Sequence, residues 1–190
     1  PRTVDRTFNP EITDPAYPSG EGPVVIVDEA HNNFHTSIGL YFPFARLLEK
    51  DGYVIQRGEE KITVDLLNSC RIYVIADAQP PERQSDPPTF SETEVKTLTA
   101  WVRAGGALFL ITDHMPDPGA IEDIADDFGI KVHNGYVIEG PPPGRVAPII
   151  FNRADNTLTD SVVTNGRNQR EKVNHVATFA GSAFQSEENF

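Results

Sequence analysis

Acidic and imidazole side chains gather directly after two short apolar segments of this sequence. They are Asp28, Glu29, His31 and His35 after residues 24–27, and Asp113 and His114 after residues 107–112. Imidazole and carboxylate groups are ligands of zinc and other divalent cations, and they also serve as general acids and bases. Three of the five histidines lie in these two segments, so these segments are the first candidates for a functional site.

The spacing of these residues favours a divalent metal site, with zinc as the first choice. Its expected ligands are Asp28, His31, His35 and His114. A metal held by such side chains activates water for hydrolysis, with Glu29 as the expected base and Asp113 and His114 as further catalytic residues. Without a metal, an Asp–His pair can supply a general base and the group that orients it.

A purely structural role for the same residues stays open. An aspartate at the end of a strand often accepts hydrogen bonds from the backbone of the following loop. A histidine in such a place often donates a hydrogen bond to a neighbouring strand. The sequence alone leaves a ligand-binding site and a structural polar network as alternatives.

Strand-like and helix-like segments alternate along the chain and must position these residues. Strands are expected at 24–28, 53–57, 71–76, 107–112 and 130–132, and helices at 40–50, 63–69, 92–104 and 120–128. This alternation predicts an α/β domain with a mostly parallel sheet. Right-handed crossovers bring the carboxyl ends of all its strands to one edge, where ligands bind in such sheets. Residues 148–152 and 176–184 are expected to add irregular, antiparallel strands.

The chain has 190 residues, a length that fits one domain. Residues 1–22 are rich in proline and polar residues and show no periodicity, so we expect an extended N-terminal arm before a single domain at 23–190. The chain begins with Pro1 and ends without a clear terminal element. We therefore expect a processed or truncated product.

Composition argues against several classes of partner. The net charge is −12, whereas nucleic-acid binding needs clustered Lys and Arg. Residues 28–31 spell the Asp-Glu-Ala-His box of helicases, but no phosphate-binding loop precedes them. The single cysteine, Cys70, cannot form an intrachain disulfide, and no apolar run is long enough to cross a membrane. A small polar ligand is the expected partner, and the oligomeric state is left open.

The segment Trp-Val-Arg-Ala-Gly-Gly-Ala-Leu-Phe-Leu-Ile-Thr-Asp-His at residues 101–114 resembles a segment of class I glutamine amidotransferase-like domains. It is most similar to their non-amidotransferase branch, which includes trehalose-utilisation proteins, intraflagellar-transport relatives and uncharacterised bacterial domains. The resemblance covers residues 23–135. It implies a flavodoxin-like, doubly wound sheet with helices on both faces, and it places Asp113 and His114 where amidotransferases carry their nucleophile.

The same resemblance argues against glutaminase chemistry. No cysteine occupies the elbow at residues 112–116, and His175 is followed by Val-Ala and not by the pattern His-x-Glu. Two functions remain. One is a metal-assisted hydrolase of a small polar or carbohydrate-like substrate, and the other is a non-catalytic ligand-binding or protein-interaction domain of an exported or envelope-associated assembly. The first residue, the arm and the bacterial relatives favour an extracytoplasmic location.

Overall fold

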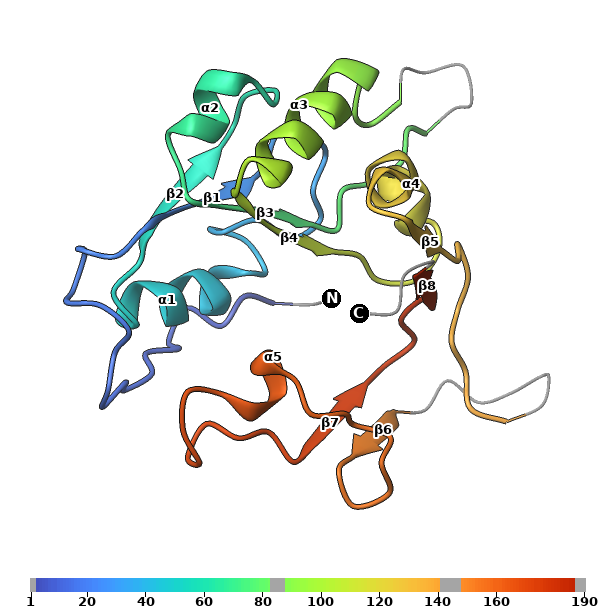
Figure 1. Ribbon diagram of the computed structural model, residues 1–190. Helices are drawn as coiled ribbons and strands as arrows, with labels where there is room; N and C mark the ends of the chain where they lie inside the picture. The colour runs from blue at the N-terminus through green and yellow to red at the C-terminus, as the bar shows by residue number, and fades with distance from the viewer. Residues whose placement is uncertain (1–2, 83–87, 141–147, 187–190) are drawn as a thin grey trace.

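A four-stranded parallel sheet forms the centre of the molecule. The computed structural model describes residues 3–82, 88–140 and 148–186. The strands are β1 (Val24–Asp28), β2 (Val54–Gly58), β3 (Ile72–Ala76) and β4 (Ala107–Ile111), in the order β2-β1-β3-β4. All three neighbouring pairs are parallel, so the four carboxyl ends lie at one edge of the sheet (Figure 1).

Helices cover both faces of this sheet. Helices α2 (Val64–Asn68), α3 (Glu92–Arg103) and α4 (Pro118–Asp127) lie on one face, and α1 (Phe42–Lys50) lies on the other (Figure 1). Successive side chains of a strand point to opposite faces, so β1 contributes Ile26 to one core and Val25 and Val27 to the other. The expected α/β fold with a mostly parallel sheet and helices on both faces is confirmed.

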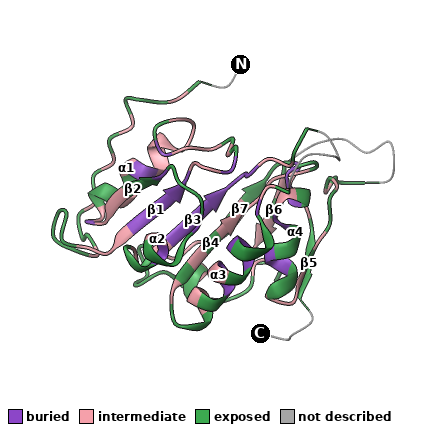
Figure 2. Ribbon diagram, turned by 90° about the horizontal axis from the view of Figure 1, so that it is seen from above, coloured by how far each residue is buried: buried purple, intermediate pink, exposed green. Residues whose placement is uncertain are grey.

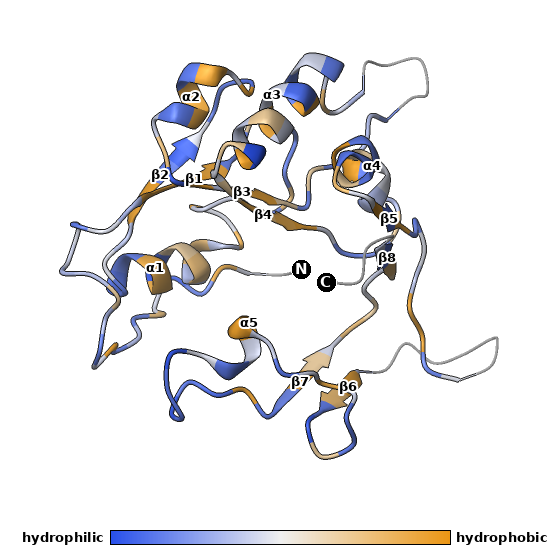
Figure 3. Ribbon diagram, in the orientation of Figure 1, coloured by the Kyte–Doolittle hydropathy of each residue, from blue (hydrophilic) through white to orange (hydrophobic). Residues whose placement is uncertain are grey.

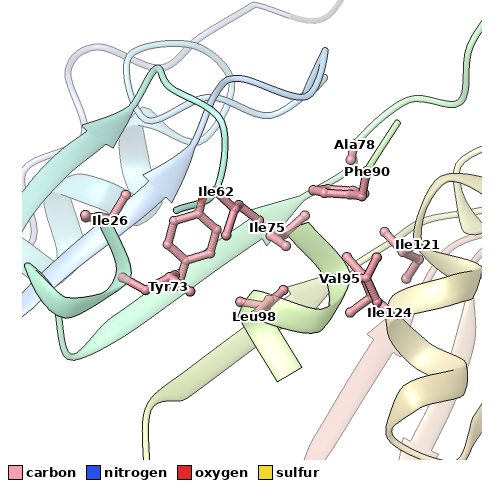
Figure 4. Close-up of a cluster of buried hydrophobic side chains, with 11 residues drawn as sticks. Ile26, Ile62, Tyr73, Ile75, Ala78, Phe90, Val95, Leu98, Ile121 and Ile124 are labelled. Atoms are coloured by element: carbon pink, nitrogen blue, oxygen red, sulfur yellow. The ribbon is translucent and has the colours of Figure 1, made fainter. Parts of the chain in front are cut away.

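The larger core lies under α2, α3 and α4. Tyr73 and Ile75 from β3 contact Leu98 of α3 and Ile124 of α4 in one buried cluster (Figure 4). The central strands β1 and β3 are almost wholly buried, whereas the edge strand β4 is only partly covered (Figure 2). Burial on both faces explains why the two central strands are continuous apolar segments in the sequence.

Local signals in the sequence set the beginnings of the helices. Thr63 accepts a hydrogen bond from the backbone N–H of Leu66 at the start of α2. Ser91 and Glu94 form the reciprocal pair of hydrogen bonds that a capping box requires at the start of α3. Helix α1 begins at Phe42, two residues later than expected, with Pro43 in its first turn, where the missing N–H costs no hydrogen bond.

Beyond α4, short antiparallel pairs replace the parallel sheet. Strand β5 (Ile130–Val132) pairs with β8 (Phe184–Ser186), and β6 (Ile149–Asn152) pairs with β7 (His175–Thr178). The segment 176–184, expected as one strand, is divided between β7 and β8. A short helix, α5 (Val162–Asn165), lies between β6 and β7 in sequence, and apolar and polar residues mix along this region (Figure 3). These pairs confirm the expected irregular β additions.

The N-terminal arm has no helix or strand in its described residues and lies along the β2 and α1 side of the sheet. The backbone N–H of Tyr17 donates to Asp51, and the N–H of Gly22 donates to Gly52. The ring of Tyr17 meets the ring of Tyr53 edge-on, at 5.2 Å between centroids. Among the described residues, no helix has both the length and the apolar character to cross a membrane.

Candidate functional site

Asp28, His31 and Glu94 form a buried triad next to the first strand. Asp28 is the last residue of β1, and the loop that follows turns His31 back onto it. His31 Nδ1 lies 2.8 Å from Asp28 Oδ1, and His31 Nε2 lies 2.9 Å from Glu94 Oε1 at the start of α3. All three residues are at most 4% exposed. An imidazole whose two nitrogens both face carboxylates is held as the doubly protonated cation.

Neighbouring groups complete the hydrogen bonding of this buried triad. The Tyr73 hydroxyl donates to Asp28 Oδ1 at 2.9 Å, and Asn33 Nδ2 donates to Asp28 Oδ2 at 3.0 Å. The His31 ring stacks on Phe90 with centroids 4.2 Å apart. Burial by itself lowers the pKa of His31, but the hydrogen bonds and charges of Asp28 and Glu94 outweigh it, so that the pKa is raised.

Glu94 joins three segments of the chain. Besides His31, its carboxylate accepts hydrogen bonds from the backbone N–H of Ile62 at 3.1 Å and from the backbone and hydroxyl of Ser91. Burial opposes ionisation, but the hydrogen bonds from Ser91, His31 and Ile62 prevail and lower the pKa of Glu94 to about 2. The triad therefore fastens the loop after β1 to the beginning of α3.

Glu29, the base expected from the sequence, is directed toward β2. Its Oε1 accepts hydrogen bonds from the backbone N–H and the hydroxyl of Ser37, at 2.8 and 2.6 Å. Its Oε2 accepts a hydrogen bond from Nε of Arg57, at 2.7 Å. Both carboxylate oxygens are thus engaged, and the side chain is 3% exposed.

His35 meets a residue that the sequence analysis did not select, Asp77. His35 Nδ1 lies 2.5 Å from Asp77 Oδ2, directly after β3. The contact lacks hydrogen-bond geometry, and both His35 Nδ1 and Asp77 Oδ1 are buried without a hydrogen bond in the described part of the chain. Asp77 is 3% exposed and has a φ of 47°, in the left-handed region, which Asp and Asn enter more readily than other residues with a side chain.

Aromatic and acidic side chains surround this pair. The Tyr41 ring lies 4.4 Å from the His35 ring, and Phe34 meets His35 edge-on at 5.1 Å. Burial raises the pKa of Tyr41, and the charges of Asp77 and Asp113 raise it further. The charges of Asp113, which follows β4, and of Asp77 therefore both act on the Tyr41 hydroxyl.

His114 and Asp117 extend the group along the loop after β4. The His114 ring stacks on Tyr136 at 4.4 Å, and its Nε2 lies 3.9 Å from Asp113 Oδ2. Asp117 accepts a hydrogen bond from Gln79 at 2.8 Å. Burial raises the pKa of Asp117, Gln79 and His114 oppose the rise, and Asp77 and Asp113 add to it.

This second group, the carboxyl-edge cluster, consists of His35, Tyr41, Asp77, Asp113, His114 and Asp117. The structure thus divides the residues selected from the sequence. Asp28 and His31 belong to the buried triad, Glu29 faces Arg57, and the three others, His35, Asp113 and His114, belong to the cluster.

The expected zinc ligands are not arranged as a metal centre. Within residues 3–82, 88–140 and 148–186, no three His, Cys, Asp or Glu side chains are placed to hold one ion. Asp28 and His31 bond to each other, and His31 has no nitrogen left for a metal. The described residues thus offer no three-donor group for zinc in this arrangement, and zinc binding stays a prediction.

Sequence reasoning missed Asp77, Asp117 and Glu94. The rule that selected Asp28 and Asp113, an acidic residue directly after an apolar strand, also applies to Asp77 after residues 72–76. The sequence indicates a role for Glu94 only as part of the capping box with Ser91. Nothing in the sequence links it to His31, which lies 63 residues away.

Comparison with known proteins gives a likeness of fold. A solved mmIFT52 N-terminal domain superposes with a TM-score of 0.59 at 14% sequence identity, covering 87% of this chain and 69% of that one. At this identity the likeness shows the fold alone. It agrees, at that level, with the intraflagellar-transport part of the family resemblance. No family model matches the chain, and no curated protein matches its sequence.

Proposed function

We propose that this domain hydrolyses a small polar substrate at the carboxyl-edge cluster, with His35 as the general base and Asp77 as the group that orients it. The close contact between His35 Nδ1 and the buried Asp77 carries the proposal. A structural ion pair gains most from complete hydrogen bonding, as in the buried triad, whereas this pair leaves buried polar atoms without partners among the described residues.

The chemistry follows from the two ring nitrogens. Nδ1 faces the Asp77 carboxylate, so Nε2 is the nitrogen left to take a proton from water. The water oxygen attacks the electrophilic carbon of the substrate while Nε2 accepts its proton. Asp77 stabilises the imidazolium that forms, and the leaving group then takes the proton from Nε2. No step in this scheme uses Glu29, His31 or a metal.

Ester hydrolysis tests this proposal with p-nitrophenyl acetate as a generic probe. His35→Gln is expected to lower the second-order rate constant by at least about tenfold, because general-base catalysis contributes about 10²–10⁴-fold. His133→Gln is the matched control, because His133 is exposed and lies outside the cluster. Equal rates for wild type and His35→Gln, with both proteins folded by circular dichroism, would contradict the proposal.

A protein-interaction domain is the second candidate, and exposed apolar residues favour it. Val162 and Val163 of α5 are 90% and 82% exposed, and Phe184 of β8 is 70% exposed. Apolar side chains so open to solvent are typical of interaction surfaces when they form a contiguous patch. Sedimentation equilibrium of wild type and of the double variant V162S/V163S tests this candidate. Association that V162S/V163S abolishes supports it, and a monomeric wild type argues against self-association through α5.

A further inference from the structure

We infer that the outer edge of β4, the side away from β3, binds an extended segment of a partner protein as an added strand. The bound segment is apolar and uncharged where it lies beside β4, and lysine or arginine residues flank it. The inference goes beyond the proposed function, because it concerns another part of the molecule. The cavity beside this edge is lined by residues of α3 and β4, the end of α4 and the start of β5.

Backbone groups of β4 that could pair with a further strand are the first argument. The N–H of Ala107 donates to the carbonyl of Arg71, so the backbone of Ala107 faces β3. Backbone groups of successive residues alternate between the two sides of a strand, so those of Leu108 and Leu110 face the outer edge. Among the described residues β4 pairs with β3 alone. The N–H and C=O groups of Leu108 and Leu110 therefore lie ready for an added strand.

The two edges of the sheet differ in charge, which is the second argument. At the other edge, β2 carries Arg57, which pairs with Glu29 and Glu59. Charged side chains on an edge strand oppose the addition of another strand, and proteins use them for this purpose. Strand β4 reads Ala-Leu-Phe-Leu-Ile and has neither a charge nor a proline. The edge at β2 is thus protected against strand addition, whereas the edge at β4 is not.

A cavity of about 670 Å³ beside this edge is the third argument. Its apolar lining consists of Val102 of α3, Leu108 and Leu110 of β4, and Phe128 and Ile130. Helices α3 and α4 lie over the same face of the sheet (Figure 1). When a peptide adds to a sheet as a strand, main-chain hydrogen bonds supply affinity and pockets for alternate side chains supply specificity. The cavity therefore predicts Val, Ile or Leu at every second residue of the bound segment.

Charge defines the residues that flank the bound segment. The cavity is lined by one basic and one acidic side chain, Arg103 and Asp127, so the segment inside it is expected to be uncharged. The whole chain carries a net charge of −12, from 28 acidic and 16 basic residues. Such a protein attracts basic segments and repels acidic ones. A second copy of this chain fits less well than a basic partner, because it carries the same negative charge.

Fluorescence anisotropy with labelled peptides tests the inference. The probe is fluorescein-Lys-Lys-Val-Thr-Val-Thr-Val-Lys-Lys, which is expected to bind saturably to the wild-type protein. Proline in place of its central valine removes an N–H and is expected to raise the Kd at least about tenfold. Glutamate in place of its lysines is expected to raise the Kd at least about fivefold at low salt. Absence of saturable binding, or equal affinity of either altered peptide, would overturn the inference.

Phe109→Lys tests whether the peptide binds at β4. Phe109 is 51% exposed, so a lysine there can reach water, and its charge repels the basic peptide and opposes strand addition. The Kd is expected to rise at least about tenfold. Ile150→Lys in β6 is the matched control, because Ile150 is 55% exposed and lies outside the lining of the cavity. Equal Kd values for the two variants, both folded by circular dichroism, would contradict the inference.

Hydrogen exchange of the wild-type protein tests the same contact without a substitution. Saturation with the peptide is expected to slow the exchange of the Leu108 and Leu110 amides at least about tenfold, measured by NMR, because both N–H groups become hydrogen-bonded. Unchanged exchange at both amides would overturn the inference, whether or not Phe109→Lys folds.

Sedimentation equilibrium distinguishes a peptide partner from a second copy of the chain. A wild-type dimer that Phe109→Lys converts to a monomer would overturn the inference, because the edge of β4 would then belong to a second copy. V162S/V163S changes neither β4 nor the lining of the cavity, so it is expected to bind the peptide as tightly as the wild type does. Peptide binding that is lost in V162S/V163S would place the contact at α5 and contradict the inference.

Discussion

His31 Nε2 lies 2.9 Å from Glu94 Oε1 and thereby joins the loop after β1 to the first turn of α3. His35, four residues further along the same loop, meets Asp77 without a completed hydrogen bond. Two histidine–carboxylate pairs thus follow one strand, and their surroundings differ. The first pair has every hydrogen bond that a structural role requires, whereas the second leaves two buried atoms without a hydrogen-bond partner among the described residues.

Glu94→Gln tests the structural role of the buried triad. The amide would place an NH₂ donor where Glu94 now accepts from Ser91 and would leave His31 with one carboxylate. We expect the free energy of unfolding to fall by about 3–5 kcal/mol, the range for breaking a buried ion pair. Urea unfolding measures this value. The control is Glu92→Gln, whose exposed partner is Lys96, and it is expected to cost less than about 0.5 kcal/mol.

The titration of the same residues predicts how stability depends on pH. The pKa of His31 is higher in the folded protein than its ordinary value of 6.5. The contribution of His31 to the free energy of unfolding is therefore complete below pH 6.5 and is lost as the pH rises through the pKa of the folded state. The pKa of Glu94 falls from 4.5 to about 2, so its contribution is present above 4.5 and is lost as the pH falls toward 2. The stabilisation is therefore greatest between about pH 4.5 and 6.5.

Urea unfolding of wild type and His31→Gln across pH 2–9 checks this expectation. The difference in unfolding free energy between the two proteins should be largest in the window between 4.5 and 6.5 and should shrink on both sides. A difference that stays constant with pH would show that His31 is not held as a cation.

Glu29→Gln distinguishes the base expected from the sequence from the base proposed from the structure. Both oxygens of Glu29 are engaged by Ser37 and Arg57, and Arg57 is 41% exposed. We expect a loss of about 0.5–1.5 kcal/mol in unfolding free energy, because one partner is open to solvent. Hydrolysis of p-nitrophenyl acetate should stay within about twofold of wild type. A tenfold loss of rate would restore Glu29 as the base.

Much of the fold follows from local sequence. The apolar segments that became β1 and β3 are continuous because the sheet is covered on both faces. Ser91 and Glu94 mark the start of α3, because a capping box involves residues only three apart. Strand β5 was expected as a strand, but nothing local shows that it pairs with β8, which is more than fifty residues away in sequence.

The position of the candidate residues in the fold was predicted, whereas their functional role stays a prediction. Parallel topology places Asp28, His35 and Asp113 at one edge, and the structure places them there. Parallel topology does not determine which histidine contacts which carboxylate. That pairing depends on the path of the loop after β1, where Asn32 adopts a φ of 51° and the following residues reach β3. His31 and His35 are therefore equivalent in the sequence and different in the structure.

The central claim is that Asp77 serves a ligand and not the fold, and the unfolding free energy of Asp77→Asn in urea tests it most directly. Asparagine has the shape of aspartate and tolerates a positive φ, so the substitution removes mainly the charge. We predict a stability within about 0.5 kcal/mol of wild type, or above it, since functional sites often cost stability. A loss of about 3 kcal/mol or more, as expected for a structural buried ion pair, would contradict the account.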